Sequence, residues 1–195
     1  MNDIYQERYV KHQARKALSL TSGFGSKKFK KYSRKEQKTF FEISKNRRSQ
    51  RVFNNEKITD TQLFHILDAI DNSPSSCSRK GVTAKLVTMR NDKDLLSGLL
   101  VGGVGWCYRG QIIFLLVSNE LCYKNPAEKE IMPYLDAGVV IQSIYLACEA
   151  LNLGCCYINP NIRADNEEFF KERFLAPGER FCGALVVGNY DLKHV

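Results

Sequence analysis

Three arginines and a serine stand within the five residues "RRSQR", positions 47–51, ahead of a predicted helix. Each guanidinium group presents a planar fork of N–H donors that matches the oxygens of a phosphate or a carboxylate. The serine adds a hydroxyl group. Such a cluster can bind an anion, but it can equally be a set of solvated charges before a helix. The segment alone leaves both interpretations open.

Other residue types that commonly do chemistry are dispersed along the chain. The seven cysteines include no C-x-x-C pair, and the three histidines are far apart, so no metal site is predicted. No His, Asp and Glu residues form a recognisable acid–base group, and we expect no catalytic side chain. The glycine-rich stretch "VGGVGWCYRGQ", residues 101–111, lacks the residue order of a phosphate-binding P-loop. Its Trp106 fits an aromatic lid or a core residue equally well.

The net charge of +8 is concentrated near the N-terminus. Residues 1–51 contain 15 Lys and Arg against 4 Asp and Glu, and the other 144 residues have a net charge of −3. We therefore expect a basic N-terminal arm over residues 1–43 and one domain over residues 44–195. The arm can bind nucleic acid, an acidic membrane surface or an acidic partner, or it can wrap a neighbouring subunit.

The cysteine content and the N-terminal sequence predict a reducing, cytoplasmic location. An odd number of cysteines is typical of free thiols, and residues 1–16 contain no apolar signal region. No apolar run reaches the roughly 18 residues that cross a bilayer, so no membrane span is predicted.

Hydrophobic periodicity predicts helices before and after the arginine and serine cluster at residues 47–51. Thr59 and Gln62 form a capping-box pattern at the start of an amphipathic helix over residues 58–70. The serine- and proline-rich loop 71–78 ends this helix. Shorter helices are expected at residues 1–20, 36–47, 91–100 and 164–175.

The longest predicted helix, residues 132–154, is apolar on nearly all sides, so it should be buried in a core or at a subunit interface. Pro133 fits its first turn and Gly154 fits its C-terminal end. Strands are expected at residues 83–90, 111–118, 155–158 and 181–188. Helices and strands mixed in this way predict a layered α+β or α/β domain.

The order of four segments resembles the nitroreductase-like family of FMN-dependent flavoproteins. The segments are "RRSQRVF", "SPSS", "LDAGVVIQSIYLACEALNLG" and "ALVVGNY", and the likeness covers residues 44–190. The resemblance implies an α+β fold, a three-layer sandwich whose central, mostly antiparallel sheet is flanked by helices. It also implies a homodimer with FMN at the subunit interface and NAD(P)H as co-substrate.

The resemblance further implies which residues contact the flavin. The arginine and serine cluster corresponds to residues that contact the phosphate, the ribityl chain and the pyrimidine edge, and Arg48 and Arg51 would stabilise the reduced anionic flavin. The "SPSS" loop of the partner subunit would line the isoalloxazine ring. The implied cofactor-binding residues are Arg47, Arg48, Ser49, Arg51, Pro74, Ser75, Ser76, Ser78, Asn159, Pro160 and Lys193.

The chain departs from the family pattern in three places. Residues 78–82 read "SRKGV" where N-x-Q-P-W is usual, so the stacking tryptophan is missing. Asn159 and Pro160 stand where a Gly or Glu-Gly usually faces N5 of the flavin. Lys193 is the one candidate for the basic residue after the last strand, and the basic N-terminal arm is expected to replace a C-terminal arm.

These features predict an FMN-dependent oxidoreductase. It would transfer hydride from NAD(P)H to a nitroaromatic, quinone or enone acceptor in a ping-pong scheme. One alternative is a flavin-dependent oxidase or dehydrogenase of a specific metabolite or peptide, which the altered "SRKGV" segment and the basic arm would suit. The other alternative is a non-enzymatic module with a degenerate flavin site.

Overall fold

The computed structural model describes residues 30–191, so the predicted helix at residues 1–20 and Lys193 lie outside the described residues. The chain divides into two units, Met1–Thr39 and Phe40–Val195. The predicted boundary after residue 43 stays a prediction.

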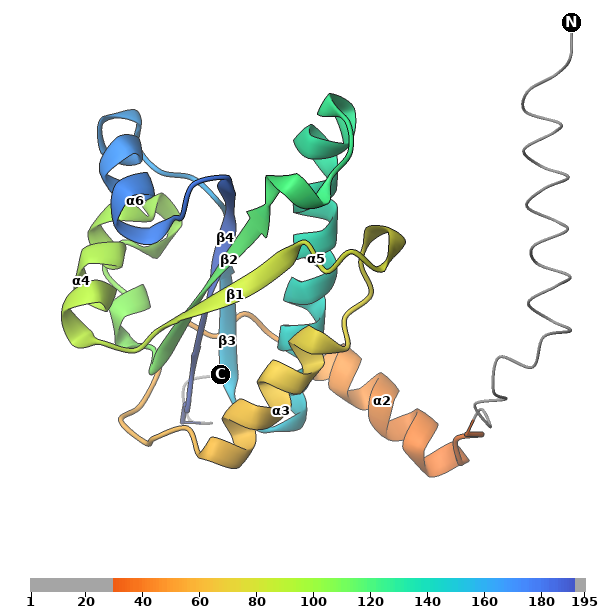
Figure 1. The fold of residues 1–195 in the computed structure, drawn as a ribbon. Coiled ribbons are helices and arrows are strands. Elements are labelled where there is room, and N and C mark those ends of the chain that lie inside the picture. Colours follow the sequence, from red (N-terminus) through yellow and green to blue (C-terminus); the bar gives the residue numbers. More distant parts are fainter. Residues whose placement is uncertain (1–29, 192–195) are drawn as a thin grey trace, which may run out of the picture. The chain divides into compact units, whose positions relative to one another are not determined.

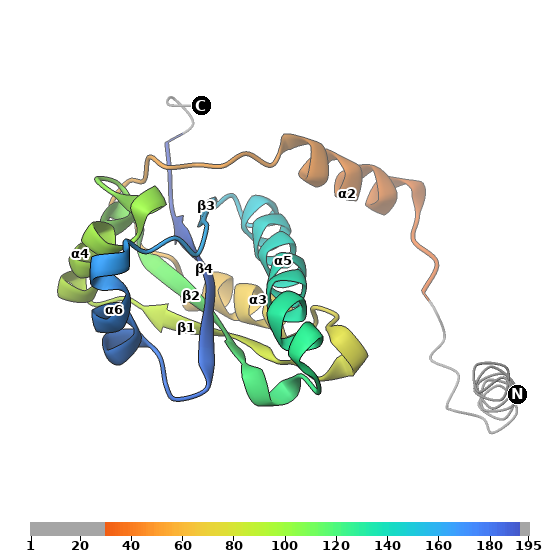
Figure 2. The same cartoon turned by 90° about the horizontal axis from the view of Figure 1, so that it is seen from above.

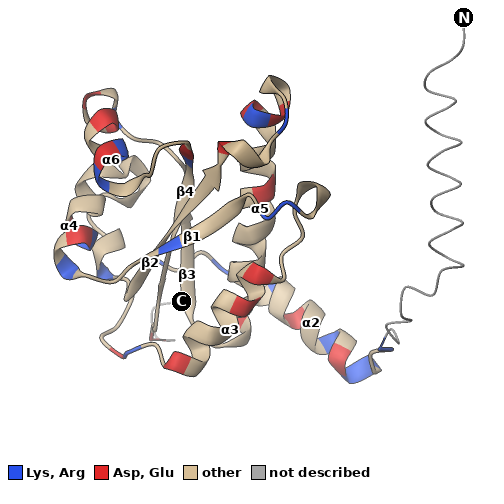
Figure 3. Cartoon of the chain, in the orientation of Figure 1, with Lys and Arg blue, Asp and Glu red and all other residues tan. Residues whose placement is uncertain are grey.

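Helix α2 (Arg34–Asn46), which begins in the first unit, confirms the helix predicted at residues 36–47. Ser33 and Glu36 bond reciprocally at its start, because Ser33 Oγ accepts the Glu36 N–H at 3.3 Å and the Glu36 carboxylate accepts the Ser33 N–H at 2.8 Å. Lys30 lies 2.7 Å from Glu36 and, together with Ser33, lowers the pKa of that carboxyl. Residues of both charges occur along α2 (Figure 3), and none of its residues is buried.

The second unit is built on a four-stranded sheet with the order β1-β2-β4-β3, in which every neighbouring pair is antiparallel. Helices cover both faces of this sheet (Figures 1 and 2). The elements are α3 (Asp60–Asp71), β1 (Val82–Val87), α4 (Arg90–Leu99), β2 (Ile112–Asn119), α5 (Pro126–Ala150), β3 (Gly154–Ile158), α6 (Glu167–Phe174) and β4 (Glu179–Gly188), with short 3₁₀ turns at Ser76–Ser78, Val101–Gly103, Cys107–Arg109, Glu120–Cys122 and Ala164–Asn166.

Two apolar layers separate the sheet from its helices. Side chains alternate across a strand, so Phe114 of β2 packs in the layer beneath α3 and α5, and the next residue, Leu115, packs in the layer beneath α4 and α6. Ile144 of α5 belongs to the first layer and Phe170 of α6 to the second. The predicted α+β sandwich of three layers is thus confirmed.

Local signals located most elements correctly. The capping box at the start of α3 is present, with the Thr59 and Gln62 side chains bonded reciprocally. All four predicted strands occur, and β2 and β4 are central. Helix α5 differs from its prediction, because it begins two turns earlier, at Pro126, with Asn125 as N-cap. Pro133 therefore lies inside the helix, not in its first turn.

Gly154 opens β3 instead of ending α5, whose C-cap is Leu151. A Cβ atom at Gly154 would lie 3.2 Å from Gln50 Cβ and 3.2 Å from the Phe53 ring. The glycine therefore allows the arginine and serine segment to pass close to β3.

Among the described helices, α5 alone is long and apolar enough to cross a membrane by length and composition, a test that core helices also pass. In this structure it lies on the sheet, with Val140, Ile144 and Cys148 buried. It is therefore a core helix of the domain.

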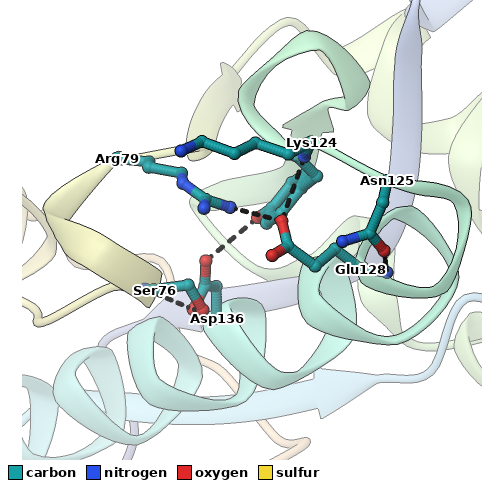
Figure 4. A network of polar contacts seen from close by, with 7 residues as sticks. Ser76, Arg79, Lys124, Asn125, Glu128 and Asp136 are labelled. Atoms are coloured by element: carbon teal, nitrogen blue, oxygen red, sulfur yellow. Dashed lines mark hydrogen bonds and ion pairs between the residues drawn. The ribbon is translucent and has the colours of Figure 1, made fainter. Parts of the chain in front are cut away.

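Helix α5 also carries a buried carboxylate that holds the loop after α3. Asp136 is only 4% exposed and accepts three hydrogen bonds, from Ser76 N at 2.9 Å, Ser76 Oγ at 2.8 Å and Tyr123 Oη at 3.0 Å. Figure 4 shows this network from close by. Because a buried charge is costly unless it is hydrogen-bonded, Asp136 fixes the position of Ser76.

A second contact holds the other end of the same loop. Arg79 forms an ion pair of 2.7 Å with Glu128 in the first turn of α5, and Glu128 also accepts the Lys124 N–H at 3.0 Å (Figure 4). The Lys124 amide and Arg79 lower the pKa of Glu128. Between the two anchors, Cys77 and Ser78 have φ angles of 51° and 56°, in the left-handed region that non-glycine residues rarely adopt. The anchors hold this strained backbone in place.

We predict that Asp136→Asn lowers the free energy of unfolding by about 1.5–3 kcal/mol, because hydrogen bonds to a buried charge are lost and an amide N–H₂ then faces a donor. Urea denaturation measures this difference. The matched control is Glu130→Gln, an exposed position of the same helix. Equal denaturation midpoints for the two variants would show that the carboxylate charge does not hold the loop.

Candidate anion and cofactor site

The arginine and serine segment runs along the free edge of β3. Ser49 forms a parallel bridge with Cys155, and the Gln50 N–H donates to the Cys155 carbonyl at 2.9 Å. An extended segment directs alternate side chains to opposite sides. The side chains of Arg47, Ser49 and Arg51 are therefore expected on one side of the segment, and that of Arg48 on the other.

Arg47 and Ser49, on the first side, meet Tyr145 of α5. The Arg47 guanidinium carbon lies 4.9 Å from the centre of the Tyr145 ring, within the range of a cation–π interaction. Ser49 Oγ lies 3.2 Å from Tyr145 Oη, and the same Oη accepts the Tyr157 N–H at 2.7 Å. Burial raises the pKa of Tyr145, although its hydrogen bonds with Ser49 and Tyr157 oppose that shift.

Arg51 extends this set toward the glycine-rich loop. Its guanidinium carbon lies 5.8 Å from the centre of the Trp106 ring, which stacks on Phe53 with centroids 6.5 Å apart. Trp106 also donates its Nε1–H to the Gly102 carbonyl at 2.9 Å. The half-buried Trp106 thus packs against Phe53 and also contacts the arginine and serine segment through Arg51.

The Cys156 thiol lies between these groups. Burial raises its pKa, and the positive charge of Arg51 and the neighbouring hydroxyl groups of Ser49 and Tyr145 oppose the shift. The positive charge of Arg51 and the hydroxyl groups of Ser49 and Tyr145 therefore lie close to the same thiol at the β3 edge. This is the arrangement that an anion requires.

Arg48 lies on the other side of the segment. Its guanidinium donates to the backbone oxygens of Lys45 at 2.8 Å and Arg47 at 3.0 Å, near the end of α2. With Glu149 and Tyr190 it lines a separate hollow of about 190 Å³. The structure therefore does not bring Arg48 together with Arg47 and Arg51.

Asn159 and Pro160, both exposed, follow the far end of β3. The chain continues to Asn161, whose carbonyl accepts the Val101 N–H at 3.1 Å, so this turn lies against the glycine-rich loop. Ser49 lies beside the second residue of β3, so about 13 Å of strand separates it from Asn159, at about 3.3 Å per residue. An elongated ligand along this edge can touch both ends.

The remaining predicted site residues lie at the loop after α3. Pro74 is exposed, Ser75 Oγ accepts the Lys80 N–H at 2.9 Å, and Ser76 is bonded to Asp136. Asp136 and Tyr145 are about 13 Å apart along α5, at about 1.5 Å per residue. The loop therefore lies about 13 Å along α5 from the residue that meets the arginine and serine segment.

Sequence reasoning missed Tyr145. It lies in a helix that reads as apolar on nearly all sides, where an aromatic residue suggests packing alone. The usable signal was its hydroxyl group, because a buried tyrosine hydroxyl normally finds a hydrogen-bond partner.

Comparison with known proteins identifies the family of this chain. The model of the nitroreductase family matches residues 44–104 and 99–189. The chain is 24% identical over 156 residues to "FMN reductase [NAD(P)H]" of Bacillus subtilis (strain 168), which covers 73% of this chain and 62% of that protein. The chain thus spans less than two thirds of the length of this relative.

Solved structures agree in fold. A protein from Desulfovibrio desulfuricans, described as a nitroreductase in complex with FMN, has a TM-score of 0.65 and 22% identity over 77% of this chain and 85% of its own. NfrA2 of B. megaterium has a TM-score of 0.68 and 23% identity over 77% of this chain and 65% of its own. The fold and the matched family model together show that the chain belongs to the nitroreductase family.

Proposed function

We propose that this protein is an FMN-dependent oxidoreductase that uses NAD(P)H. The observation that carries the proposal is the placement of Arg47, Ser49 and Arg51 at alternate positions of the extended segment along the β3 edge. Membership of the nitroreductase family supports it, as do the name of the Bacillus subtilis relative and the FMN held by the Desulfovibrio protein.

The residues present fit FMN. A phosphate group accepts hydrogen bonds and donates none at neutral pH when fully ionised, so it needs donors, and arginine supplies them in pairs. Arg47, Ser49 and Arg51 would hold the phosphate, the ribityl chain and the pyrimidine edge. Asn159 and Pro160, about 13 Å along the strand, would meet the ring. When bound, FMN would carry hydride from NAD(P)H to a nitroaromatic, quinone or enone acceptor.

In this proposal the side chains bind and orient, and none must act as acid or base. The three half-buried or exposed donors, Arg47, Ser49 and Arg51, would supply positive charge and a hydroxyl group to the flavin. Trp106 would restrict the movement of Arg51. The seven free cysteines in the described residues agree with a reducing, cytoplasmic location, which we also propose.

We predict that the protein loaded with FMN loses its flavin absorbance within seconds when NADH or NADPH is added without oxygen, and regains it when a quinone is added. Stopped-flow absorbance measures both steps. The same protein without nicotinamide is the control. A flavin that binds but is not reduced by either nicotinamide would favour the oxidase or dehydrogenase alternative.

We predict that Arg51→Ala raises the dissociation constant of FMN about tenfold or more, because a hydrogen bond to a charged group is worth about 1.5–3 kcal/mol. Fluorescence titration measures the constant. Lys31→Ala removes the same charge outside the segment and should change little. Arg48→Ala should have a smaller effect than Arg51→Ala, since Arg48 lies on the other side of the segment. Equal weakening by all three substitutions would mean that only bulk charge matters.

We also propose a homodimer in which the loop at residues 74–78 of one chain meets the flavin of the other. Ile131, Leu135 and Val139 repeat every four residues on α5 and are exposed, which gives the helix an apolar face to bury.

We predict a dimer for the FMN-loaded protein by light scattering. Leu135→Glu, which places a charge on the exposed apolar face of α5, should shift the protein toward monomer and weaken FMN binding. Glu130→Gln, which also lies on α5, is the control. A monomer that retains FMN at full affinity would rule out the shared site.

A further inference from the structure

The Tyr145 side chain contacts both Arg47 and Ser49. It is 9% exposed, and its ring supports the Arg47 guanidinium at 4.9 Å. Its hydroxyl oxygen lies between the Tyr157 N–H, at 2.7 Å, and Ser49 Oγ, at 3.2 Å. Tyr145 therefore connects the β3 edge to the segment that we propose binds the cofactor.

The direction of these hydrogen bonds follows from their chemistry. A backbone N–H is always a donor, so Tyr145 Oη accepts from Tyr157. The Tyr145 O–H then needs an acceptor of its own, and among the described residues Ser49 Oγ is the oxygen that the structure places within hydrogen-bond distance, at 3.2 Å. The Cys156 sulfur is near but is a weak acceptor, and its own thiol lies 3.6 Å from the Tyr157 carbonyl.

The direction of this hydrogen bond determines what the Ser49 hydroxyl group can offer to a ligand. A hydroxyl group that accepts from Tyr145 keeps its own hydrogen free to donate. Donation is what a phosphate requires, because an ionised phosphate only accepts. A serine that instead donated to Tyr145 would present only lone pairs to an anion.

We propose that Tyr145 is a positioning residue that orients the Ser49 hydroxyl as a hydrogen-bond donor toward the phosphate of the cofactor. This inference rests on the proposed function. The hydroxyl group of Tyr145, on the core helix α5, would then contribute to the preference of the site for FMN over a flavin without a phosphate. The ring of Tyr145 has a separate role, as a support for Arg47.

The test compares FMN with riboflavin, which lacks the phosphate. Tyr145→Phe keeps the ring beneath Arg47 and removes only the hydroxyl group. We expect it to raise the dissociation constant of FMN about tenfold and to leave that of riboflavin unchanged, as Ser49→Ala should also do. The double variant should be no weaker than Ser49→Ala alone, because both substitutions remove the same interaction.

Tyr190→Phe is the matched control, because it removes a tyrosine hydroxyl on the Arg48 side of the segment. It should leave the preference for FMN over riboflavin intact. Denaturation curves for each variant separate lost stability from lost binding, since Tyr145→Phe also leaves the Tyr157 N–H without its partner.

Three results would overturn the inference: an unchanged FMN constant in Tyr145→Phe, equal weakening for both flavins, or additive effects in the double variant. Each of these leaves the proposed function standing if the unmodified protein binds FMN. An unmodified protein that binds neither flavin would contradict the proposed function as well.

Discussion

Polar groups that are buried on α5 must be hydrogen-bonded, and this need determines where the two candidate cofactor-binding segments lie. Helix α5 is mostly apolar and lies on the sheet, yet it carries Asp136 and Tyr145 into the buried layer. A buried carboxylate or hydroxyl group without a partner costs free energy comparable with that of a lost hydrogen bond or more. Asp136 satisfies this need with Ser76, and Tyr145 satisfies it with Ser49 and Tyr157. The core helix therefore positions both segments that we assign to the cofactor.

The free edge of β3 holds the arginine and serine segment in place. An edge strand leaves N–H and C=O groups unpaired, and these need partners. The Gln50 N–H satisfies the Cys155 carbonyl, and the Tyr145 hydroxyl satisfies the Tyr157 N–H. The segment is thus held extended by hydrogen bonds of its backbone, while Arg47 and Arg51 lie over the rings of Tyr145 and Trp106. Gly154 allows the close approach, because any larger residue there would collide with Gln50.

Sequence patterns predicted the α+β fold, the capped helix α3 and the central strands, because periodicity and caps are local signals. They misplaced the start of α5, whose first two turns are polar and whose Pro133 looked like an N-terminal residue. They also grouped all three arginines into one cluster, whereas the extended backbone sends Arg48 to the opposite side. The hydrogen-bond partner of Tyr145 could not be predicted, since it is a residue 96 positions away in the chain.

We propose that the β3 edge of this chain holds FMN, and the absorbance spectrum of the purified protein, with mass spectrometry of whatever is released on denaturation, tests this. We expect a flavin spectrum, as purified or after reconstitution, with FMN released at about one per chain. Released FAD, or a protein that stays colourless in micromolar FMN, would contradict it.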